Sequence, residues 1–294
     1  MRKVKNHTVI IKGGLGNQIF IYYFALFLKD RYPSDKVILE TRAYFWLDYK
    51  YKAGFKLEDL GLEIKKGSFL RSIFMVFNII KIKFVPIKIL NKINKSEVIV
   101  DDQNLHLLDN FYTKKNVFIY DGYFQDYKII DKVYEKNKIT FAGHYLSNKY
   151  KKLEREIKFN PLSIAFCIRN FNFILEDRFN YSINKFNLLI NQLIKQNKKI
   201  KFYIFAFKNI NMSEYNFPNN SELITHENGY TDDKAILKII SKCNIQVISN
   251  SSTFHWIAAY VSKWENSNSK RKQVYISKNY SIKNNLCYPE WIKF

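Results

Sequence analysis

The chain has 294 residues, of which 47% are hydrophobic, so it is long enough for two medium domains or one large one and too apolar for wholesale disorder. Its formal net charge of +22 attracts polyanions, but the basic residues are spread along the chain without a zinc-finger or RNP-type pattern, which argues against a nucleic-acid partner. Three cysteines without a CxxC pair indicate free thiols in a reducing compartment. Because no apolar run reaches the length of a membrane span, we expect a cytoplasmic protein.

The opening stretch predicts a strand, a glycine turn and a buried helix. A short apolar run at 9–11 leads into GGLGNQ at 13–18, and an apolar block at 19–28 follows at once. A helix that begins at such a turn offers free N–H groups and partial positive charge to an anion, although an ordinary tight turn is the alternative. Asn17 and Gln18 favour a binding site, because amides suit sugar hydroxyls and phosphate oxygens.

The rest of the N-terminal half continues the alternation of strands and helices. We expect strands at 35–40 (DKVILE) and 117–120 (VFIY), a short helix at 55–62 and a longer one at 127–138. A strand, a helix and a second strand in this order imply a parallel sheet.

The segment 65–95 stands apart, because it has eight Lys and Arg residues and no acidic residue, with large apolar residues between them. A basic amphipathic segment of this kind is able to lie on an anionic membrane, where each nearby Lys or Arg adds roughly 1 kcal/mol. A pair of core helices with a solvated basic face, interrupted at Pro86, is the alternative. The first interpretation predicts peripheral contact of 65–95 with the inner face of the membrane.

Strand–helix alternation restarts near residue 160, which predicts two α/β domains: one at 1–155, with 65–95 as an insertion, and a second at 156–294. The helix before 244–249 begins at Asp232, since acidic residues suit the positive end of a helix. The elements expected in the second half are strands at 163–168, 201–207, 221–225 and 244–249 and helices at 181–197, 232–242 and 257–261.

Three polar clusters follow predicted strands, at 13–18, 169–172 and 250–253. Ligands of open α/β sheets bind at the carboxyl ends of the strands. Arg169 brings a fixed charge and a planar fork that fits a diphosphate, while 250–253 supplies hydroxyls and backbone N–H groups for phosphate oxygens. Neither a DxD pair nor a His/Cys/Asp cluster with ligand spacing is present in the sequence, so we expect no metal.

Three segments together are similar to a known family. GGLGNQ followed by IFIYYFALFL resembles the N-terminal motif of bacterial α-1,2-fucosyltransferases of glycosyltransferase family 11. DGYFQ at 121–125 resembles the family's G-Y-[WF]-Q segment, and NSSTFHWIAA at 250–259 resembles its N-S-[ST]-F-S-W-W-A-A motif. In this order the segments span nearly the whole chain.

The resemblance implies an α/β fold of the GT-B type, with two Rossmann-like domains facing a cleft. It implies that 1–155 is the acceptor-side domain and that 156–294 binds most of the nucleotide sugar. It implies inverting, metal-independent transfer of L-fucose from GDP-fucose to a galactoside hydroxyl in an α-1,2 linkage, without a cofactor, in lipopolysaccharide or capsule biosynthesis. A nucleotide sugar and a glycan acceptor are the implied partners. The residues that the resemblance places in the site are Arg169 and Asn17 for catalysis and Gly14, Gly16, Gln18, Cys167, Asn172, Asn250, Ser251, Ser252, Thr253 and Phe254 for donor binding.

One motif of the family is altered. Its H-x-R-R-G-D-Y segment falls on 167–173, where Arg169 keeps the first Arg but Cys167, Asn170 and Asn172 replace the His, the second Arg and the Asp. Two alternatives therefore stay open. The first alternative is a GT-B transferase with a different nucleotide-sugar donor. The second is a catalytically degenerate protein that binds a membrane surface.

The residue that accepts the proton of the acceptor hydroxyl does not follow from the sequence. His255, Glu227, Asp121 and Asp126 are the candidates. An inverting transfer with a good leaving group needs little help from a base. The base therefore stays unassigned.

Overall fold

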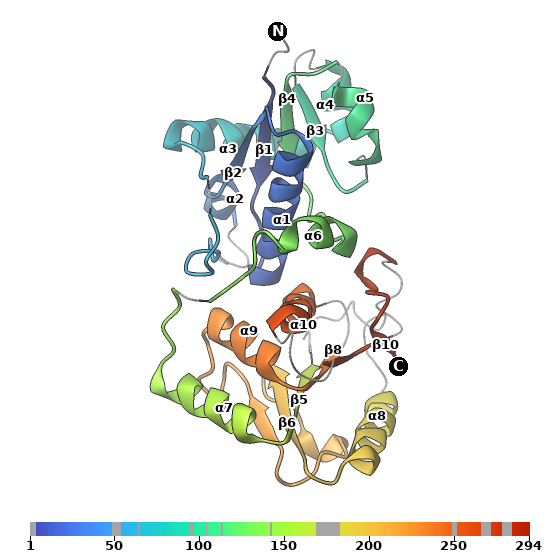
Figure 1. Cartoon of the computed structure of the whole chain (residues 1–294). Helices are drawn as coiled ribbons and strands as arrows, with labels where there is room; N and C mark the ends of the chain where they lie inside the picture. The colour runs from blue at the N-terminus through green and yellow to red at the C-terminus, as the bar shows by residue number, and fades with distance from the viewer. Residues whose placement is uncertain are drawn as a thin grey trace. The chain divides into compact units, whose positions relative to one another are not determined.

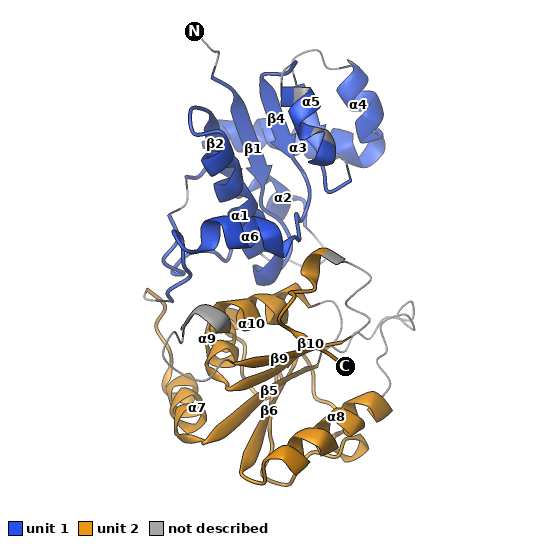
Figure 2. Ribbon diagram, turned by 45° about the vertical axis from the view of Figure 1, so that its right-hand side comes forward, with its two compact units in different colours: residues 1–142 blue, residues 143–294 orange. Residues whose placement is uncertain are grey.

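A computed structural model describes residues 4–48, 54–63, 65–93, 97–103, 105–112, 114–141, 143–168, 183–248, 252–265, 272–277 and 284–294. The chain divides into two compact units, Met1–Ala142 and Gly143–Phe294 (Figure 2). The sequence places this boundary at 155/156, which lies inside a helix of the second unit, α7. Each unit is an α/β layer structure built on its own parallel sheet.

The N-terminal unit is built on a four-stranded sheet in the order β2-β1-β4-β3, in which every pairing is parallel. The expected short helix at 55–62 is wrong, because the described residues there form turns. The break expected at Pro86 is confirmed, since α3 ends at Phe84 and α4 begins at Ile87. The elements are β1 (Asn6–Ile10), α1 (Leu15–Arg31), β2 (Lys36–Glu40), α2 (Ala43–Trp46), α3 (Phe69–Phe84), α4 (Ile87–Ile93), β3 (Glu97–Val100), a 3-10 turn (Leu105–Leu107), α5 (Leu108–Tyr112), β4 (Val117–Tyr120) and α6 (Tyr127–Tyr134).

The two faces of this sheet are covered by different helices (Figure 1). Side chains alternate across a strand, so Tyr120 of β4 faces α1, where its ring meets Phe24 at 5.3 Å, while Ile119 joins the core cluster of α3 with Met75 and Ile79. Helix α1 lies beside α6 and is buried on most of its circumference. Both faces of the sheet are therefore closed, as a parallel sheet requires.

A buried polar network closes the amino end of this sheet. His7 is 0% exposed, with Nδ1 2.8 Å from the Tyr120 hydroxyl and Nε2 3.2 Å from Oδ2 of Asp35. Its ring is stacked on Phe118 at 4.9 Å, and the Tyr112 hydroxyl donates to the same Asp35 oxygen at 2.5 Å. Burial lowers the pKa of His7, and the neighbouring carboxylate of Asp35 opposes that shift without cancelling it. The folded chain therefore favours the neutral imidazole.

This network predicts that the protein loses stability in weak acid. The unfolded chain takes up a proton near the ordinary His pKa of 6.5, where the folded chain does not, so the free energy of unfolding falls as the pH drops below 6.5. The contribution of His7 to this slope is at most about 1.4 kcal/mol per pH unit. Urea unfolding followed by circular dichroism from pH 7.5 to 5.5 measures it. The slope becomes shallower in His7→Gln and is unchanged in His106→Gln, an exposed control; equal slopes in both variants contradict the assignment.

The C-terminal unit is built on a six-stranded, wholly parallel sheet in the order β10-β9-β8-β5-β6-β7. Numbered from β5, this is the 3-2-1-4-5-6 order of dinucleotide-binding folds. The elements are α7 (Asn148–Phe159), β5 (Leu162–Ile168), α8 (Ile183–Gln196), β6 (Ile200–Ala206), a 3-10 turn (Met212–Glu214), β7 (Glu222–Ile224), α9 (Asp233–Lys242), β8 (Ile245–Ile248), α10 (Thr253–Glu265), β9 (Gln273–Ile276), a 3-10 turn (Asn284–Leu286) and β10 (Ile292–Lys293).

Helices cover both faces of the second sheet (Figure 2). Helix α8 buries Phe186, Leu189 and Ile190 against Phe166 of β5 and its neighbours. Helices α7, α9 and α10 lie side by side, with α9 between the other two. Asp232 caps α9 as expected, since its carboxylate accepts from the N–H groups of Lys234 and Ala235.

Candidate functional site

The glycine turn joins β1 to α1 at the carboxyl edge of the first sheet. Gly13 has φ +74°, and a Cβ there would lie 2.9 Å from Nδ2 of Asn17, so both conformation and space favour glycine. Gly14 caps α1 without a side-chain bond, is exposed, and has open space where a Cβ would stand. Gly16 is buried in the first turn of the helix. The free N–H groups at the start of α1 therefore lie next to the exposed Gly14. An anion needs this kind of access to a helix N-terminus.

Gln18 is fully enclosed, at 0% exposed. Its Nε2 donates to the carbonyls of Gly13 and Gly54, both at 2.8 Å, and its Oε1 accepts from the N–H of Lys56 at 2.9 Å. Both amide hydrogens are therefore used within the protein. In this structure Gln18 fixes the glycine turn against the loop at 54–56, which is a positioning role and not the expected direct contact with the donor.

The motif at 121–125 lies beside this turn. The side chain of Gln125 donates to Oδ1 of Asn17 at 2.9 Å. Asp102, which follows β3, accepts from the N–H groups of Tyr123 at 2.9 Å and Phe124 at 2.6 Å. Phe124 has φ +49°, an uncommon conformation for a residue with a side chain, and its ring stacks on Phe24 at 3.8 Å. Three strand ends thus converge on one polar cluster that holds Asn17 in place.

Lys12 and Asp121 form an ion pair across the ends of β1 and β4, with Nζ and Oδ1 2.5 Å apart and side chains 13% and 15% exposed. The Lys12 ammonium also lies 4.9 Å from the ring centre of Tyr123. The sequence interpretation missed Lys12. A basic residue between a buried strand and a glycine turn is the signal that points to it.

In the second unit the corresponding place is the carboxyl edge of the sheet at β5 and β8. These two strands are neighbours in the sheet although they are not consecutive in the sequence. The two strands end within one residue of each other, because Ile248, the last residue of β8, pairs with Cys167, the residue before the last of β5. The segments 169–182 and 249–251 follow these strands directly and lie outside the described residues, so the expected positions Arg169, Asn172, Asn250 and Ser251 are not described. The topology brings the carboxyl ends of β5 and β8 to one edge, where ligands of such sheets bind.

Ser252 begins α10 at this edge. It is 4% exposed, and its hydroxyl accepts from the N–H of His255 at 3.4 Å, as an N-cap does. Thr253 and Phe254 form the first turn and are partly exposed. The indole of Trp256 donates to the carbonyl of Leu286 at 2.7 Å and fixes the helix from behind.

Cys167 is enclosed in the middle of the second sheet, at 0% exposed. Burial raises the pKa of the Cys167 thiol well above its usual range, and the nearby Cys243 adds to the shift. Burial likewise raises the pKa of Cys243 to about 12. Both thiols are neutral and unreactive at pH 7. The expected contact between Cys167 and the donor does not fit a side chain buried within the sheet.

The candidate bases have different surroundings. Asp126 caps α6 by accepting from the N–H of Lys128 at 2.9 Å, and Glu227 accepts from the N–H of Asn209 at 2.8 Å. His255 is 9% exposed within α10. None of these contacts distinguishes a base.

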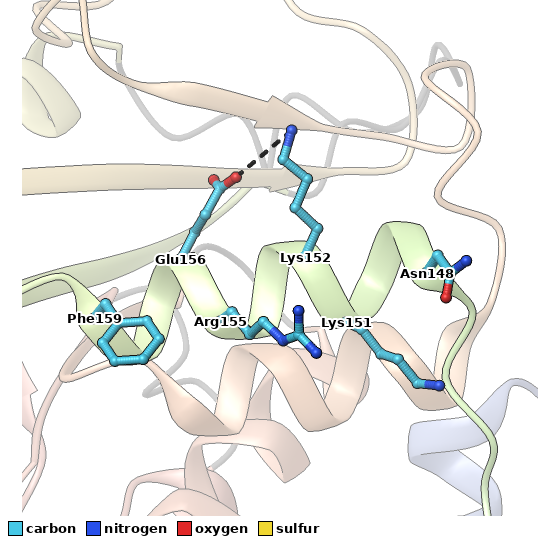
Figure 3. Close-up of a pocket in the computed structure, with 6 residues that line it drawn as sticks. All are labelled: Asn148, Lys151, Lys152, Arg155, Glu156 and Phe159. Atoms are coloured by element: carbon cyan, nitrogen blue, oxygen red, sulfur yellow. Dashed lines mark ion pairs between the residues drawn. The ribbon is translucent and has the colours of Figure 1, made fainter.

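The outer surface of α7 carries a hollow of about 390 Å³ (Figure 3). All its lining side chains come from that one helix, including the pair Lys152 and Glu156, whose charged atoms are 4.0 Å apart. It is a furrow on a solvated basic face, where Oε2 of Glu156 lies 3.6 Å from Nζ of Lys201 near the amino end of β6. Within the described ranges, no group of three His, Cys, Asp or Glu side chains is placed to hold a metal.

The role of Gln18 predicts that Gln18→Ala costs stability before it costs binding. The change leaves one N–H and two carbonyls without their partner. A buried group without a partner costs about 1–3 kcal/mol, and these three groups are only partly buried, so we expect the free energy of unfolding to fall by about 3 kcal/mol, the lower end for three groups. Urea unfolding measures the change. Gln192→Ala, on the exposed face of α8, is the control. A Gln18→Ala protein of unchanged stability that loses only ligand binding would show that the amide contacts the ligand directly.

No family model matches the chain, and no curated protein has a matching sequence. Solved structures do match. A variant of FUT1 from Arabidopsis thaliana in complex with GDP is 14% identical, with a TM-score of 0.53, over 93% of this chain and 70% of that one. Fucosyltransferase NodZ from Bradyrhizobium is 12% identical, with a TM-score of 0.51, over 87% and 92%. NodZ α-1,6-fucosyltransferase soaked with GDP-fucose is 10% identical, with a TM-score of 0.53, over 88% and 93%.

At these identities the likeness concerns the fold. The chain has the mixed α/β, GT-B-type fold of two Rossmann-like units that fucosyltransferases have, which confirms the fold class expected from the sequence.

Proposed function

We propose that the protein is a glycosyltransferase that uses GDP-fucose. One observation carries this proposal: the segments that resemble or align with family 11 motifs come, in the chain, after strands that lie side by side in the two parallel sheets. In the first unit, 13–18 follows β1 and 121–125 follows β4; in the second, 169–172 follows β5 and 250–254 follows β8. Solved structures of similar fold include fucosyltransferases, among them one in complex with GDP and one soaked with GDP-fucose.

The finer assignment is inverting transfer of L-fucose to a galactoside hydroxyl in an α-1,2 linkage, without metal, for a surface polysaccharide. The acceptor oxygen bonds to C1 of fucose while the bond from C1 to the β-phosphate oxygen breaks. GDP leaves with that electron pair, and the acceptor proton passes to a base or to water. The demand on the protein is to stabilise an oxocarbenium-like transition state and a departing diphosphate.

Each unit has a distinct part in this scheme. The N-terminus of α10, capped by Ser252, presents N–H groups and partial positive charge to the diphosphate. Arg169, the first residue after β5, adds a full charge that offsets the charge developing on the leaving group. Asn17, held by Gln125, presents an amide to the sugar or its acceptor. Preorganised groups of this kind require no rearrangement as the charge develops.

Isothermal titration with GDP in EDTA tests the nucleotide site. We expect binding at micromolar concentration, weakened at least tenfold in Arg169→Ala, and a transfer rate lowered on the order of 10²–10³-fold, as for loss of one preorganised charge contact. Arg155→Ala, in the exposed furrow of α7, is the matched control and leaves both values unchanged. If GDP does not bind the wild-type protein, the proposal fails.

A screen of nucleotide-sugar donors on galactose-terminated acceptors, with mass spectrometry of the products, tests the donor assignment. We expect a mass increase of one deoxyhexose with GDP-fucose alone, and NMR of the product to give an α-1,2 linkage. Transfer from another donor favours the alternative in which the altered 167–173 motif has changed the donor. GDP binding without transfer from any donor favours a degenerate binding protein.

A further inference from the structure

The solvent face of α3 is apolar, which is unusual for a helix on a protein surface. Phe74 is 53% exposed, Phe77 60%, and Phe84 82%. The full row of large apolar side chains that stand out from this helix is Phe69, Leu70, Ile73, Phe74, Phe77, Ile80 and Phe84. Successive members of the row are one to four residues apart, so they share one face of the helix. A contiguous exposed row of this size marks an interaction surface.

The opposite face of α3 is fixed in the protein, so the exposed row does not exchange with the core. Met75 and Ile79 are buried in the first unit's core cluster. The Ser72 hydroxyl donates to Oε2 of Glu40 at 3.0 Å, and the guanidinium of Arg71 donates to the hydroxyl of Thr8. Such polar contacts form in only one orientation of α3 about its own axis, so they fix which face of the helix points outward. The outward row is therefore a permanent surface.

Every charged residue within 65–95 is basic. Within 65–95, Arg71 turns inward to Thr8 and Lys66 pairs with Glu58 at 2.6 Å. The exposed lysines Lys81, Lys83, Lys88 and Lys92 appear in none of the ion pairs found among the described residues. Lys81 and Lys83 belong to the last turn of α3 itself. An apolar stripe beside unneutralised lysines fits a surface that is apolar inside and anionic outside.

Two further contacts support a rigid platform. The side chain of Asn91 in α4 accepts from the N–H of Ile99 at 2.7 Å and donates to its carbonyl at 2.8 Å, which ties α4 to the edge strand β3. Trp46, 43% exposed, meets the ring of Phe69 edge-on at 5.7 Å. A tryptophan side chain that is partly buried and partly exposed to solvent is typical of a membrane–water interface.

We propose that the outward face of α3, with the lysines of α3 and α4 beside it, docks the protein peripherally on an anionic membrane. Within the described residues no helix is long and apolar enough to cross a bilayer. Binding of this face to the same face of a second copy is disfavoured, because the lysines of the two copies would then repel each other. This inference does not depend on the proposed transferase activity.

Flotation of the full-length protein with vesicles tests the proposal. We expect binding to vesicles of phosphatidylcholine and phosphatidylglycerol, weakened by high salt, and little binding to phosphatidylcholine alone. Phe74→Ser with Phe77→Ser lowers the bound fraction at least tenfold. The matched control, Phe159→Ser with Leu188→Ser, removes two apolar side chains of the second unit that are even more exposed, and it leaves binding unchanged.

The charge contribution has its own variant. Lys81→Gln with Lys83→Gln lowers binding to the anionic vesicles roughly 25-fold, at about fivefold for each lysine, whereas Lys198→Gln with Lys199→Gln has little effect. Equal binding to both vesicle types, or binding that none of these variants reduces, overturns the proposal. Lipid-independent self-association that Phe74→Ser with Phe77→Ser abolishes would instead assign the face to a second copy. We expect GDP binding to be unchanged in the α3 variants, so the test of membrane docking is independent of the test of the proposed transferase.

Discussion

Parallel strand direction is the constraint on which the rest of this structure depends. Every pairing in both sheets is parallel, so the loops that follow the strands gather at one edge of each unit. In the first unit this edge collects residues as distant in sequence as Asn17, Asp102 and Gln125. In the second it places the ends of β5 and β8 side by side. Segments that are scattered in the sequence become neighbours for this reason alone.

The first unit's site is held by polar contacts to backbone. Gln18 fixes three backbone groups of two loops, and Asp102 fixes two N–H groups of a third. Phe124 keeps a left-handed conformation that costs on the order of 1–3 kcal/mol, which these bonds and its stacking on Phe24 offset. The site is therefore preorganised in the protein alone. The side chains that hold its loops in place are different from the groups that are exposed to solvent.

The sequence predicts the elements better than it predicts the roles of side chains. The glycine turn, the break at Pro86 and the Asp232 cap are local effects of backbone freedom, a missing N–H and an N-terminal carboxylate, so they are readable in the sequence. The role of Gln18 depends on Gly54 and Lys56, whose approach depends on tertiary packing. The same holds for Cys167, which aligns with a histidine in a motif of the family that the sequence resembles but lies inside a central strand.

The two proposals meet at one place in the first unit. Ser72 bonds to Glu40, the last residue of β2, so the start of α3 lies at the carboxyl edge of the sheet. Trp46 follows the same strand and meets Phe69, the first residue of α3. A membrane in contact with this face would therefore lie beside the edge that carries Asn17 and its turn. An acceptor glycan carried on a lipid would then reach this edge by diffusion in the plane of the membrane, which raises its local concentration without any further contact to the protein.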